Sequence, residues 1–177
     1  DIKHAHSSNL DQTTESLVAA IQRARNDRVN LICFVSGVPG AGKTLTGLNA
    51  VHSPELRQES KSCGVFLSGN GPLIKIVTAA LVRELKQLHP ELGKAEIQRK
   101  IRSFIHNVHW FINYYDRDRR DEPPTENVIV FDEAQRAWSA EKMEREERGS
   151  LSEPDLMLQI MGRLDWCAIV TLGGGGQ

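Results

Sequence analysis

The sequence lacks the features that would place it in a membrane or in a disulfide-stabilised fold. It contains no apolar run of about 18 residues, the length that a membrane-spanning helix needs. Its first residues, DIKHAHSSN, do not resemble a secretory signal. The cysteines are few and far apart, and they are Cys33, Cys63 and Cys167. We therefore expect buried, reduced thiols in a cytoplasmic protein that has no membrane partner.

A strong charge of either sign is also missing. The formal net charge is −1, so no overall basic field indicates nucleic-acid binding, although a local basic patch stays open. A chain of 177 residues is long enough for one full domain and too short for two ordinary ones. It begins at Asp1 and ends in GGGGQ, from which we expect an excised piece of a longer protein.

Short apolar segments alternate with segments of helical periodicity. Strands are predicted at 31–37, 63–69, 128–131 and 166–172. Helices are predicted at 16–25, 43–52, 73–88, 95–115, near 137–148 and at 154–164. Strands that alternate with helices form a parallel sheet with helices on both faces. The sequence therefore predicts one α/β domain over 1–177, in which 1–28 is a polar, partly helical N-terminal extension.

The predicted helix at 95–115 carries histidines and a group of aromatic side chains. The aromatic residues are Trp110, Phe111, Tyr114 and Tyr115. Such a group can offer faces to nucleic-acid bases, but packing in a core or against a partner domain is the favoured interpretation. His106 and His109 lie three residues apart without a third ligand nearby, which disfavours a metal site.

Residues 37–44, GVPGAGKT, match the phosphate-binding pattern G-x-x-x-x-G-K-[S/T] between a predicted strand and a predicted helix. The glycines allow the backbone N–H groups to point at phosphate oxygens, and the following helix adds the positive end of its dipole. Lys43 is expected to neutralise the β- and γ-phosphates of ATP, and the Thr44 hydroxyl is expected to bind Mg²⁺. The predicted nucleotide-binding residues are Gly37, Val38, Pro39, Gly40, Ala41, Gly42, Lys43, Thr44 and Leu45.

Residues 128–135, VIVFDEAQ, end a buried strand in two acids and a glutamine. Downstream of a phosphate loop, Asp132 is the expected second Mg²⁺ partner, and it is expected to hold the metal through water. Glu133 is then positioned to orient and deprotonate the attacking water, which favours hydrolysis over phosphate transfer to a small acceptor.

The phosphate loop and D-E-A-Q together resemble motifs I and II of the first RecA-like lobe of superfamily 1 helicases. More closely, four segments resemble a bacterial domain family of unknown function related to the Schlafen-type helicase core. These segments are GVPGAGKTLTGLNAVH, FLSGNGPL, VIVFDEAQRAW and SEPDLMLQIMGRLDW. The resemblance covers most of 30–177, and it implies a RecA-like P-loop fold, ATP hydrolysis and coupling to single-stranded DNA or RNA.

The resemblance also assigns roles to single residues. Lys43 and Thr44 match motif I, and Asp132, Glu133 and Gln135 match motif II. The expected catalytic residues are Lys43, Glu133, Gln135 and Gln177, of which the two glutamines sense the γ-phosphate. Gln177 matches the motif III glutamine, but Gly174 or Gly175 stands where that motif usually has an aspartate, which weakens this assignment.

Ser68, Asn70 and Gly71 occupy the position of motif Ia, where such motors contact the nucleic-acid backbone. Small polar side chains and exposed N–H groups suit phosphate contact without reading sequence, and a simple polar turn is the alternative.

Motors of this kind complete the ATP site with arginines from a second RecA-like lobe. We therefore expect that lobe as a partner and weak hydrolysis by this lobe alone. Arg120, Arg136 and Arg163 are the arginines considered for the same role within this chain, although arginines in loops and on helices are usually solvated.

Two other functions compete with the motor. An ATP-operated switch would gate an attached effector or an oligomer without moving along a strand, and the near-neutral charge favours it. A small-molecule phosphotransferase is the other, and Glu133 argues against it. Gln135 and the turn N-G-P at 70–72 favour the motor.

Overall fold

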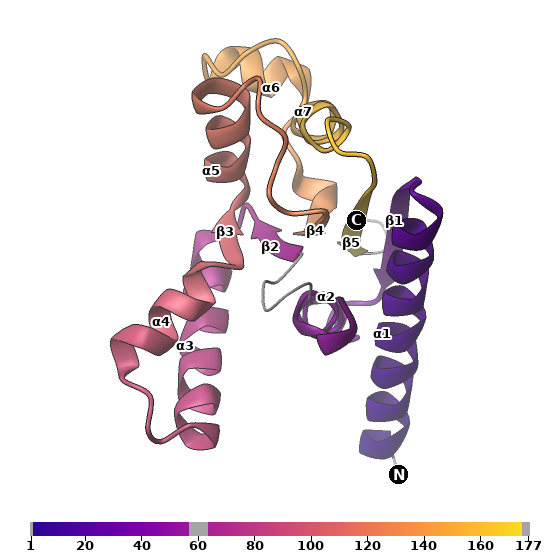
Figure 1. The fold of residues 1–177 in the computed structure, drawn as a ribbon, viewed down its shortest axis with the longest axis vertical. Helices are drawn as coiled ribbons and strands as arrows, with labels where there is room; N and C mark the ends of the chain where they lie inside the picture. The colour runs from indigo at the N-terminus through magenta and orange to yellow at the C-terminus, as the bar shows by residue number, and fades with distance from the viewer. Residues whose placement is uncertain (1, 57–63, 175–177) are drawn as a thin grey trace.

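The computed structural model describes residues 2–56 and 64–174, which fold around one five-stranded sheet (Figure 1). All neighbouring strands are parallel, and their order is β1-β5-β4-β2-β3. The strands are β1 (Asn30–Gly37), β2 (Gly64–Ser68), β3 (Ile105–Asn107), β4 (Val128–Asp132) and β5 (Cys167–Gly174). The prediction of an α/β fold with a parallel sheet is confirmed.

Helices cover both faces of the sheet. The helices are α1 (Ile2–Asp27), α2 (Lys43–His52), α3 (Gly71–Leu88), α4 (Lys94–Arg102), α5 (Val108–Asn113), α6 (Ala140–Arg145) and α7 (Glu153–Met161). Short turns are η1 (Pro54–Leu56), the π-helical η2 (Tyr114–Asp118) and the 3₁₀ turn η3 (Ala134–Arg136). In Figure 1, α1 to α4 lie below the sheet and α5 to α7 lie above it.

Two apolar clusters separate the sheet from these helices. Val130 and Phe66 point into the cluster shared with α1 and α2, whereas Ile129 and Phe131 point into the cluster shared with α5 and α7. All five residues of β2 and of β4 are buried. This burial on both faces explains why these strands are continuous apolar runs and do not alternate with polar residues.

The edge strand β1 differs, because its residues alternate between exposed and half-buried. The Ile32 side chain is 48% exposed and that of Phe34 is 81% exposed. They lie in register with Ile169 and Thr171 of β5, on the face that α7 covers only in part. One apolar part of the sheet therefore faces solvent.

The prediction of a single long helix at 95–115 is wrong. The chain forms α4, then the edge strand β3, then α5. Phe66 N–H donates to Phe104 O at 2.7 Å as the chain enters β3, and the Asn107 side chain caps α5 by accepting from His109 N–H. The apolar spacing of 104, 105 and 108 fits either structure, so pairing with β2 decided between them.

The other predicted elements agree with the structure except at their ends. The helix predicted at 16–25 extends over α1, and the one predicted near 137–148 is reduced to the six residues of α6. Cys167 is buried and Cys33 is half-buried, both are free thiols, and burial raises the pKa of each. Cys63 lies outside the described residues.

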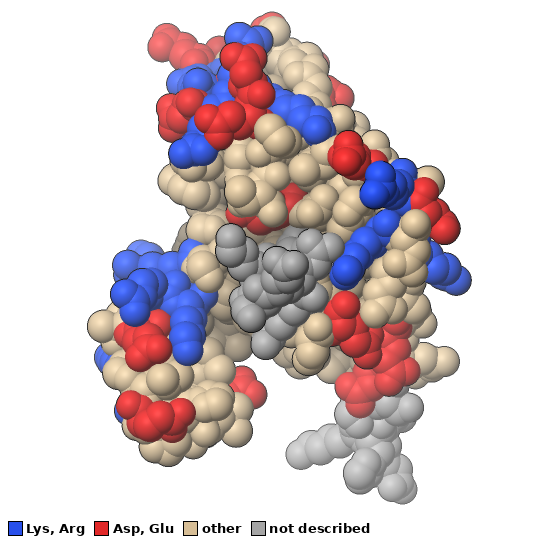
Figure 2. Space-filling view, viewed as in Figure 1, with Lys and Arg blue, Asp and Glu red and all other residues tan. Residues whose placement is uncertain are grey.

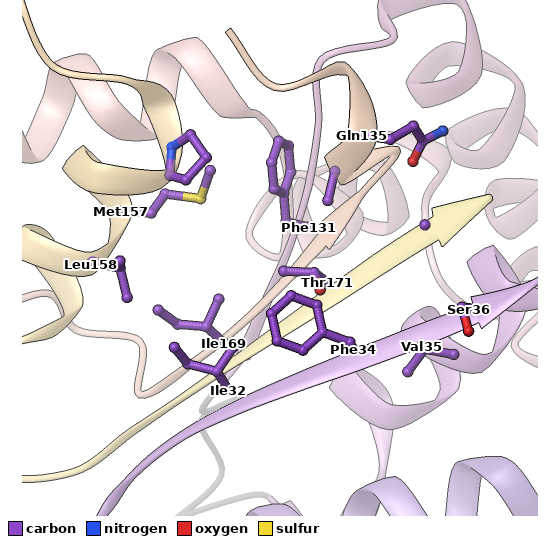
Figure 3. Close-up of a pocket in the computed structure, with 13 residues that line it drawn as sticks. Ile32, Phe34, Val35, Ser36, Phe131, Gln135, Met157, Leu158, Ile169 and Thr171 are labelled. Carbon is purple, nitrogen blue, oxygen red and sulfur yellow. The ribbon is translucent and has the colours of Figure 1, made fainter. Parts of the chain in front are cut away.

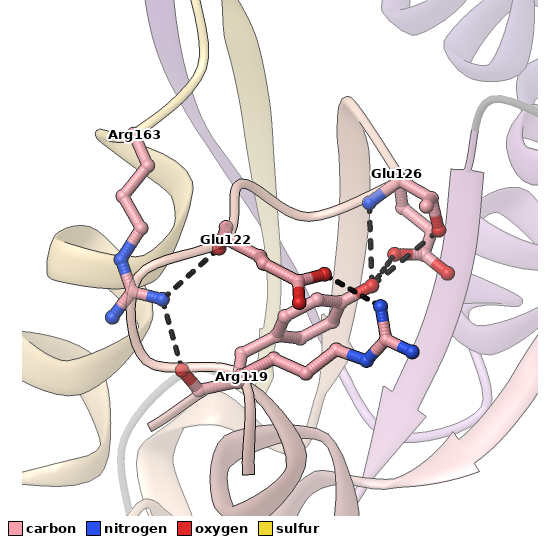
Figure 4. A network of polar contacts seen from close by, with 6 residues as sticks. Arg119, Glu122, Glu126 and Arg163 are labelled. Carbon is pink, nitrogen blue, oxygen red and sulfur yellow. Dashed lines mark hydrogen bonds and ion pairs between the residues drawn. The ribbon is translucent and has the colours of Figure 1, made fainter. Parts of the chain in front are cut away.

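The polar segment 116–127 is fixed to the domain by a network of contacts (Figure 4). The Tyr115 hydroxyl donates to Glu126 Oε2 at 2.8 Å and accepts from Thr125 N–H at 3.2 Å. Arg163 Nη1 donates to the carbonyl oxygens of Tyr115 at 2.9 Å and Glu122 at 3.3 Å. The segment therefore has a defined path along the end of α7.

Across residues 2–56 and 64–174, no helix combines the length and the apolar character that crossing a bilayer requires.

Two phenylalanines, one on the edge strand β1 and one on the inner strand β2, test how the helices cover the sheet. Phe34→Thr places a β-branched residue with a high strand preference at this position, and we expect a change below about 0.5 kcal/mol in the free energy of unfolding. Phe66, 1% exposed, is the matched control, and Phe66→Ala is expected to cost about 3–5 kcal/mol. Urea unfolding measures both, and an equal loss in both variants would contradict an uncovered β1.

Candidate nucleotide-binding and hydrolysis site

The predicted site residues gather at one edge of the sheet. Because the strands are parallel, their carboxyl ends lie together. Ser68 is in register with Asp132, Asp132 with Leu172, and Gly37 with Gly174. The phosphate loop, the acids of D-E-A-Q and the turn after β2 therefore all open at the same edge.

The phosphate loop has the conformation that anion binding needs. Gly40 and Gly42 have φ of 81° and 84°, values that favour glycine. Lys43 Nζ donates to the carbonyl oxygens of Gly37 at 2.6 Å and Val38 at 3.0 Å, so its ammonium lies across the loop. A cavity of about 420 Å³ opens between residues 40–45 and α3. The lysine and the loop backbone fit a nucleotide phosphate chain.

Helix α1 lies against the back of this loop. A Cβ on Gly42 would lie 2.7 Å from Leu10 Cδ1, so Leu10 would have to shift, and the positive φ is what requires glycine here. Residues 1–28, predicted as an extension, thus contact the nucleotide loop through Leu10.

Thr44 and Asp132 form the oxygen pair predicted for Mg²⁺. The Thr44 hydroxyl donates to Asp132 Oδ2 at 3.0 Å, and Glu133 N–H donates to Asp132 Oδ1 at 3.0 Å. Asp132 is 4% exposed, and burial raises the pKa of its carboxyl, against the opposing effect of these two hydrogen bonds. A divalent cation held by oxygen atoms would relieve the cost of this buried charge, so the pair fits Mg²⁺.

Glu133 follows Asp132 in a left-handed backbone conformation, with φ 56° and ψ 40°. This conformation costs a non-glycine residue about 1–3 kcal/mol, and such strain is concentrated at functional sites. It turns the chain sharply out of β4 into η3. The Glu133 carboxylate contacts Arg136, whose Nε lies 2.8 Å from Oε2.

Gln135 joins the turn after β4 to the end of β5. Its Oε1 accepts from Gly174 N–H at 3.4 Å. The D-E-A-Q glutamine thus contacts the glycine segment that carries the motif III resemblance. Gln177 lies outside the described residues, so the second glutamine stays a prediction.

The three residues predicted to contact nucleic acid, at the turn after β2, have different environments. Ser68 is fully buried, and its hydroxyl accepts from Asn70 N–H at 3.1 Å. Ser68 therefore shapes the turn and is not exposed for contact with a nucleic-acid backbone, contrary to the prediction. Asn70 Oδ1 caps α3 by accepting from Leu73 N–H at 3.1 Å. Asn70 and Gly71 line a cavity of about 370 Å³ that also reaches Glu133 and Arg136.

A buried carboxylate forms the floor of this second cavity. Glu153 is 1% exposed, and its Oε2 accepts from Trp138 N–H at 2.8 Å while its Oε1 lies 2.6 Å from His109 Nδ1. The His109 ring packs on Trp138, and Lys142 Nζ lies 4.3 Å from the centre of the indole. These contacts fix the wall of the cavity that faces the Asn70–Gly71 turn.

A third cavity, of about 430 Å³, is apolar and lies over the exposed face of β1 and β5 (Figure 3). Ile32, Phe34 and Ile169 point into it, and α7 borders it through Met157. Gln135 stands at its end nearest the carboxyl edge. A structure that fills this cavity would therefore also contact the D-E-A-Q turn.

The three arginines considered as charge donors within the chain are not equivalent. Arg163 is held by backbone carbonyl groups of 115 and 122, away from the phosphate loop. Arg136 pairs with Glu133. Arg120 is exposed and forms no ion pair with any residue in the described ranges. None of them contacts Lys43 or Thr44.

The aromatic residues of 110–115 divide between core and surface. Phe111 and Tyr115 are buried. Trp110, 50% exposed, stacks between His106 and Tyr114, with ring centres 4.6 and 5.1 Å apart. These stacking partners already occupy part of the indole surface, which favours a packing role for Trp110 over stacking on a base. No group of three His, Cys, Asp or Glu suited to a metal ion occurs among the residues described.

Basic side chains do gather on one surface, but away from the carboxyl edge. Figure 2 shows Lys and Arg over α4. The last turn of α4 holds Arg99, Lys100 and Arg102. Since β3 begins only after this helix, these residues lie towards the amino ends of the strands.

The sequence reasoning missed several features of the site. It considered Arg136 as a charge donor but not as the partner of Glu133, and it did not single out Trp138, Lys142 or Glu153. The three-residue spacing of Glu133 and Arg136 was a usable signal, because one turn of helix brings such residues together.

Comparison with known proteins gives one family. The sequence model of the family described as Schlafen group 3, DNA/RNA helicase domain, matches residues 30–177. Among curated proteins no match was found. The matched region starts at the first residue of β1 and includes the whole sheet and every site residue above, whereas α1 precedes it. The predicted relation to a Schlafen-type helicase core is confirmed, and its assignment to superfamily 1 and to a bacterial group stays a prediction.

The burial of Asp132 predicts a pH-dependent stability effect. A carboxyl whose pKa is raised in the folded state stabilises the fold fully below its ordinary value of 3.8, and this stabilisation is lost as the pH rises through the folded-state pKa. We therefore expect the metal-free Asp132→Asn variant to unfold at a higher temperature than the unmodified protein at pH 7. The difference should disappear below about pH 3.8.

Thermal unfolding at pH 7 and pH 3.5, with and without Mg-ATP, measures this effect. Asp165→Asn, at an exposed position, is the matched control and should change little. Mg-ATP should stabilise the unmodified protein more than the Asp132→Asn variant. A lower unfolding temperature of that variant at pH 7 without metal would contradict the expected cost of the buried carboxylate.

Proposed function

Since the chain belongs, over residues 30–177, to the Schlafen group 3 DNA/RNA helicase domain family, we propose that it is an ATP-hydrolysing motor lobe that acts on single-stranded nucleic acid. The observation that carries the proposal is the contact between Thr44 and Asp132, 3.0 Å apart, beside the phosphate-loop lysine and one residue before Glu133. This arrangement supports metal-assisted hydrolysis of ATP better than transfer to a small acceptor.

In the proposed reaction Lys43 moves from the loop carbonyl groups to the β- and γ-phosphates. Thr44 and Asp132 would hold Mg²⁺, Asp132 through water, and the ion would supply positive charge at the phosphate oxygens. Glu133 accepts a proton from water as the water oxygen bonds to the γ-phosphorus. The bond from that phosphorus to the bridging oxygen breaks, and ADP leaves with the electron pair.

Gln135 is proposed to report the state of the γ-phosphate. Its contact with Gly174 N–H gives it one partner on β5, and its match to the motif II glutamine supports a role beside the reacting phosphate. A rotation of this side chain would transmit hydrolysis to β5. Gln177 is proposed to act with it, as the resemblance implies.

The nucleic-acid strand is proposed to lie along the carboxyl edge, at the turn that holds Asn70 and Gly71. Both residues line the cavity that reaches Glu133, so a strand there would lie close to the hydrolytic carboxylate. Backbone N–H groups and an amide suit phosphate contact without base recognition.

A second RecA-like lobe is proposed as the partner that completes the site. Arg163 is engaged with backbone carbonyl groups and Arg136 contacts Glu133, and neither arginine contacts the phosphate loop, beside which the γ-phosphate would lie. Arginines supplied from another lobe are worth about 10³–10⁵ in rate. The lobe alone is therefore expected to bind Mg-ATP and hydrolyse it slowly.

A nucleotide switch without strand movement is the second candidate. The position of the basic residues of α4, far from the carboxyl edge, favours it, because a strand on the proposed path would meet few of them. Both candidates need Lys43 for nucleotide binding, and they differ in their response to nucleic acid.

Steady-state ATP hydrolysis by the full-length protein, with and without single-stranded DNA or RNA, tests the proposal. We expect stimulation by at least one of the two nucleic acids. Lys43→Ala should weaken nucleotide binding at least about tenfold, and Glu133→Gln should lower kcat by about 10²–10⁴ while nucleotide binding is retained. Activity that depends on Lys43 but ignores both nucleic acids would favour the switch.

Gln135→Ala tests the relay. We expect a lower kcat for stimulated hydrolysis with little change in the affinity for Mg-ATP, because the side chain contacts β5 and not the phosphate loop. Stopped-flow binding of a fluorescent ATP analogue and steady-state kinetics separate the two quantities. A loss confined to ATP affinity would assign Gln135 to nucleotide binding instead.

A further inference from the structure

The contact between Glu133 and Arg136 places a cation on the carboxylate that is proposed to receive the proton. Arg136 Nε lies 2.8 Å from Glu133 Oε2, although the angle between them does not make a hydrogen bond. Oε2 is shielded from solvent. The two groups thus attract each other by charge, without a directional hydrogen bond, at an oxygen that is closed to solvent.

The arginine is much more accessible than its partner. The Arg136 side chain is 73% exposed, compared with 32% for that of Glu133. Its backbone is fixed, because Arg136 N–H donates to Glu133 O at 2.8 Å within the η3 turn. Only the side chain needs to rotate to release the carboxylate, so the exchange requires no change in the fold.

The space into which Arg136 can move is the cavity of about 370 Å³ beside it. Each acid of this cavity lies beside a basic side chain, since Glu133 contacts Arg136 and Glu153 contacts His109. Lys142 also lines it, and it forms no ion pair within residues 2–56 and 64–174. Arg136 and Lys142 therefore offer an anionic ligand two cationic side chains in this cavity. Asn70 and Gly71, the proposed strand contacts, form its opposite side.

We propose that this cavity receives a backbone phosphate of the single-stranded nucleic acid and that Arg136 exchanges between Glu133 and that phosphate. Guanidinium groups bind phosphate through paired hydrogen bonds, a geometry that the contact with Glu133 lacks. When Arg136 turns to the phosphate, Glu133 Oε2 becomes free to accept a proton from water. Arg136 is thus a positioning residue that makes hydrolysis depend on the strand, and this role rests on the proposed function.

The variant Arg136→Ala separates this role from a structural one. Without nucleic acid, its kcat should rise several-fold above that of the unmodified protein while KM for ATP is unchanged, because nothing then covers Glu133. The ratio of kcat with oligo(dT) or oligo(rU) to kcat without nucleic acid should therefore be smaller than in the unmodified protein. Arg120→Ala, at an exposed arginine outside the cavity, is the matched control and should leave both rates unchanged.

Strand affinity gives a second readout that loss of a structural contact would not produce. Fluorescence anisotropy with labelled oligo(dT) or oligo(rU) should show about tenfold weaker binding by Arg136→Ala. The slope of log affinity against log salt should become shallower by about 0.7, the value for one lost phosphate contact on a single strand. Arg136→Lys should retain this slope.

The outcomes distinguish the two proposals. A protein that hydrolyses ATP but responds to neither nucleic acid would overturn the proposed motor and this inference together. Stimulated hydrolysis in the unmodified protein, with strand-free kcat unchanged or lowered in Arg136→Ala, would overturn only the inference. An unchanged slope of log affinity against log salt in Arg136→Ala would also overturn only the inference, because it would show that Arg136 makes no contact with a phosphate.

Discussion

The parallel register of β2, β4, β5 and β1 is the constraint on which the site depends. Ser68, Asp132 and Leu172 lie side by side, and so do Gly37 and Gly174. A shift of one residue would turn every side chain of a strand to the other face of the sheet. The register therefore places Asp132 within hydrogen-bonding distance of Thr44 and directs the chain after each strand to the same edge.

The sequence predicted those parts of the molecule whose signals are local. Two kinds of short pattern each predict their own local structure without help from distant residues. They are the glycines and lysine of the phosphate loop and the apolar runs of β2 and β4. The break of the supposed helix at Ser103 was not predictable in this way, since pairing of 105–107 with β2 competes with helical spacing. The burial of Ser68 and the position of Arg136 likewise depend on neighbours distant in the sequence.

The two faces of the sheet serve the site differently. On the face of α1 and α2, large side chains fill the space behind the phosphate loop. On the other face, α5 and α7 leave Phe34 and Ile32 uncovered beside the D-E-A-Q turn. The phosphate loop thus has packed side chains behind it, whereas the turn that carries Glu133 and Gln135 has open space on both sides.

The packing of α1 has a practical consequence for defining the domain. The family match starts at residue 30, yet Leu17, Val18 and Ile21 of α1 are buried in the same cluster as α2 and β5. Leu10 also abuts Gly42 of the phosphate loop. A boundary drawn at the matched region would remove this wall and expose the apolar side chains behind the loop. The smallest stable unit therefore includes the helix that sequence similarity omits.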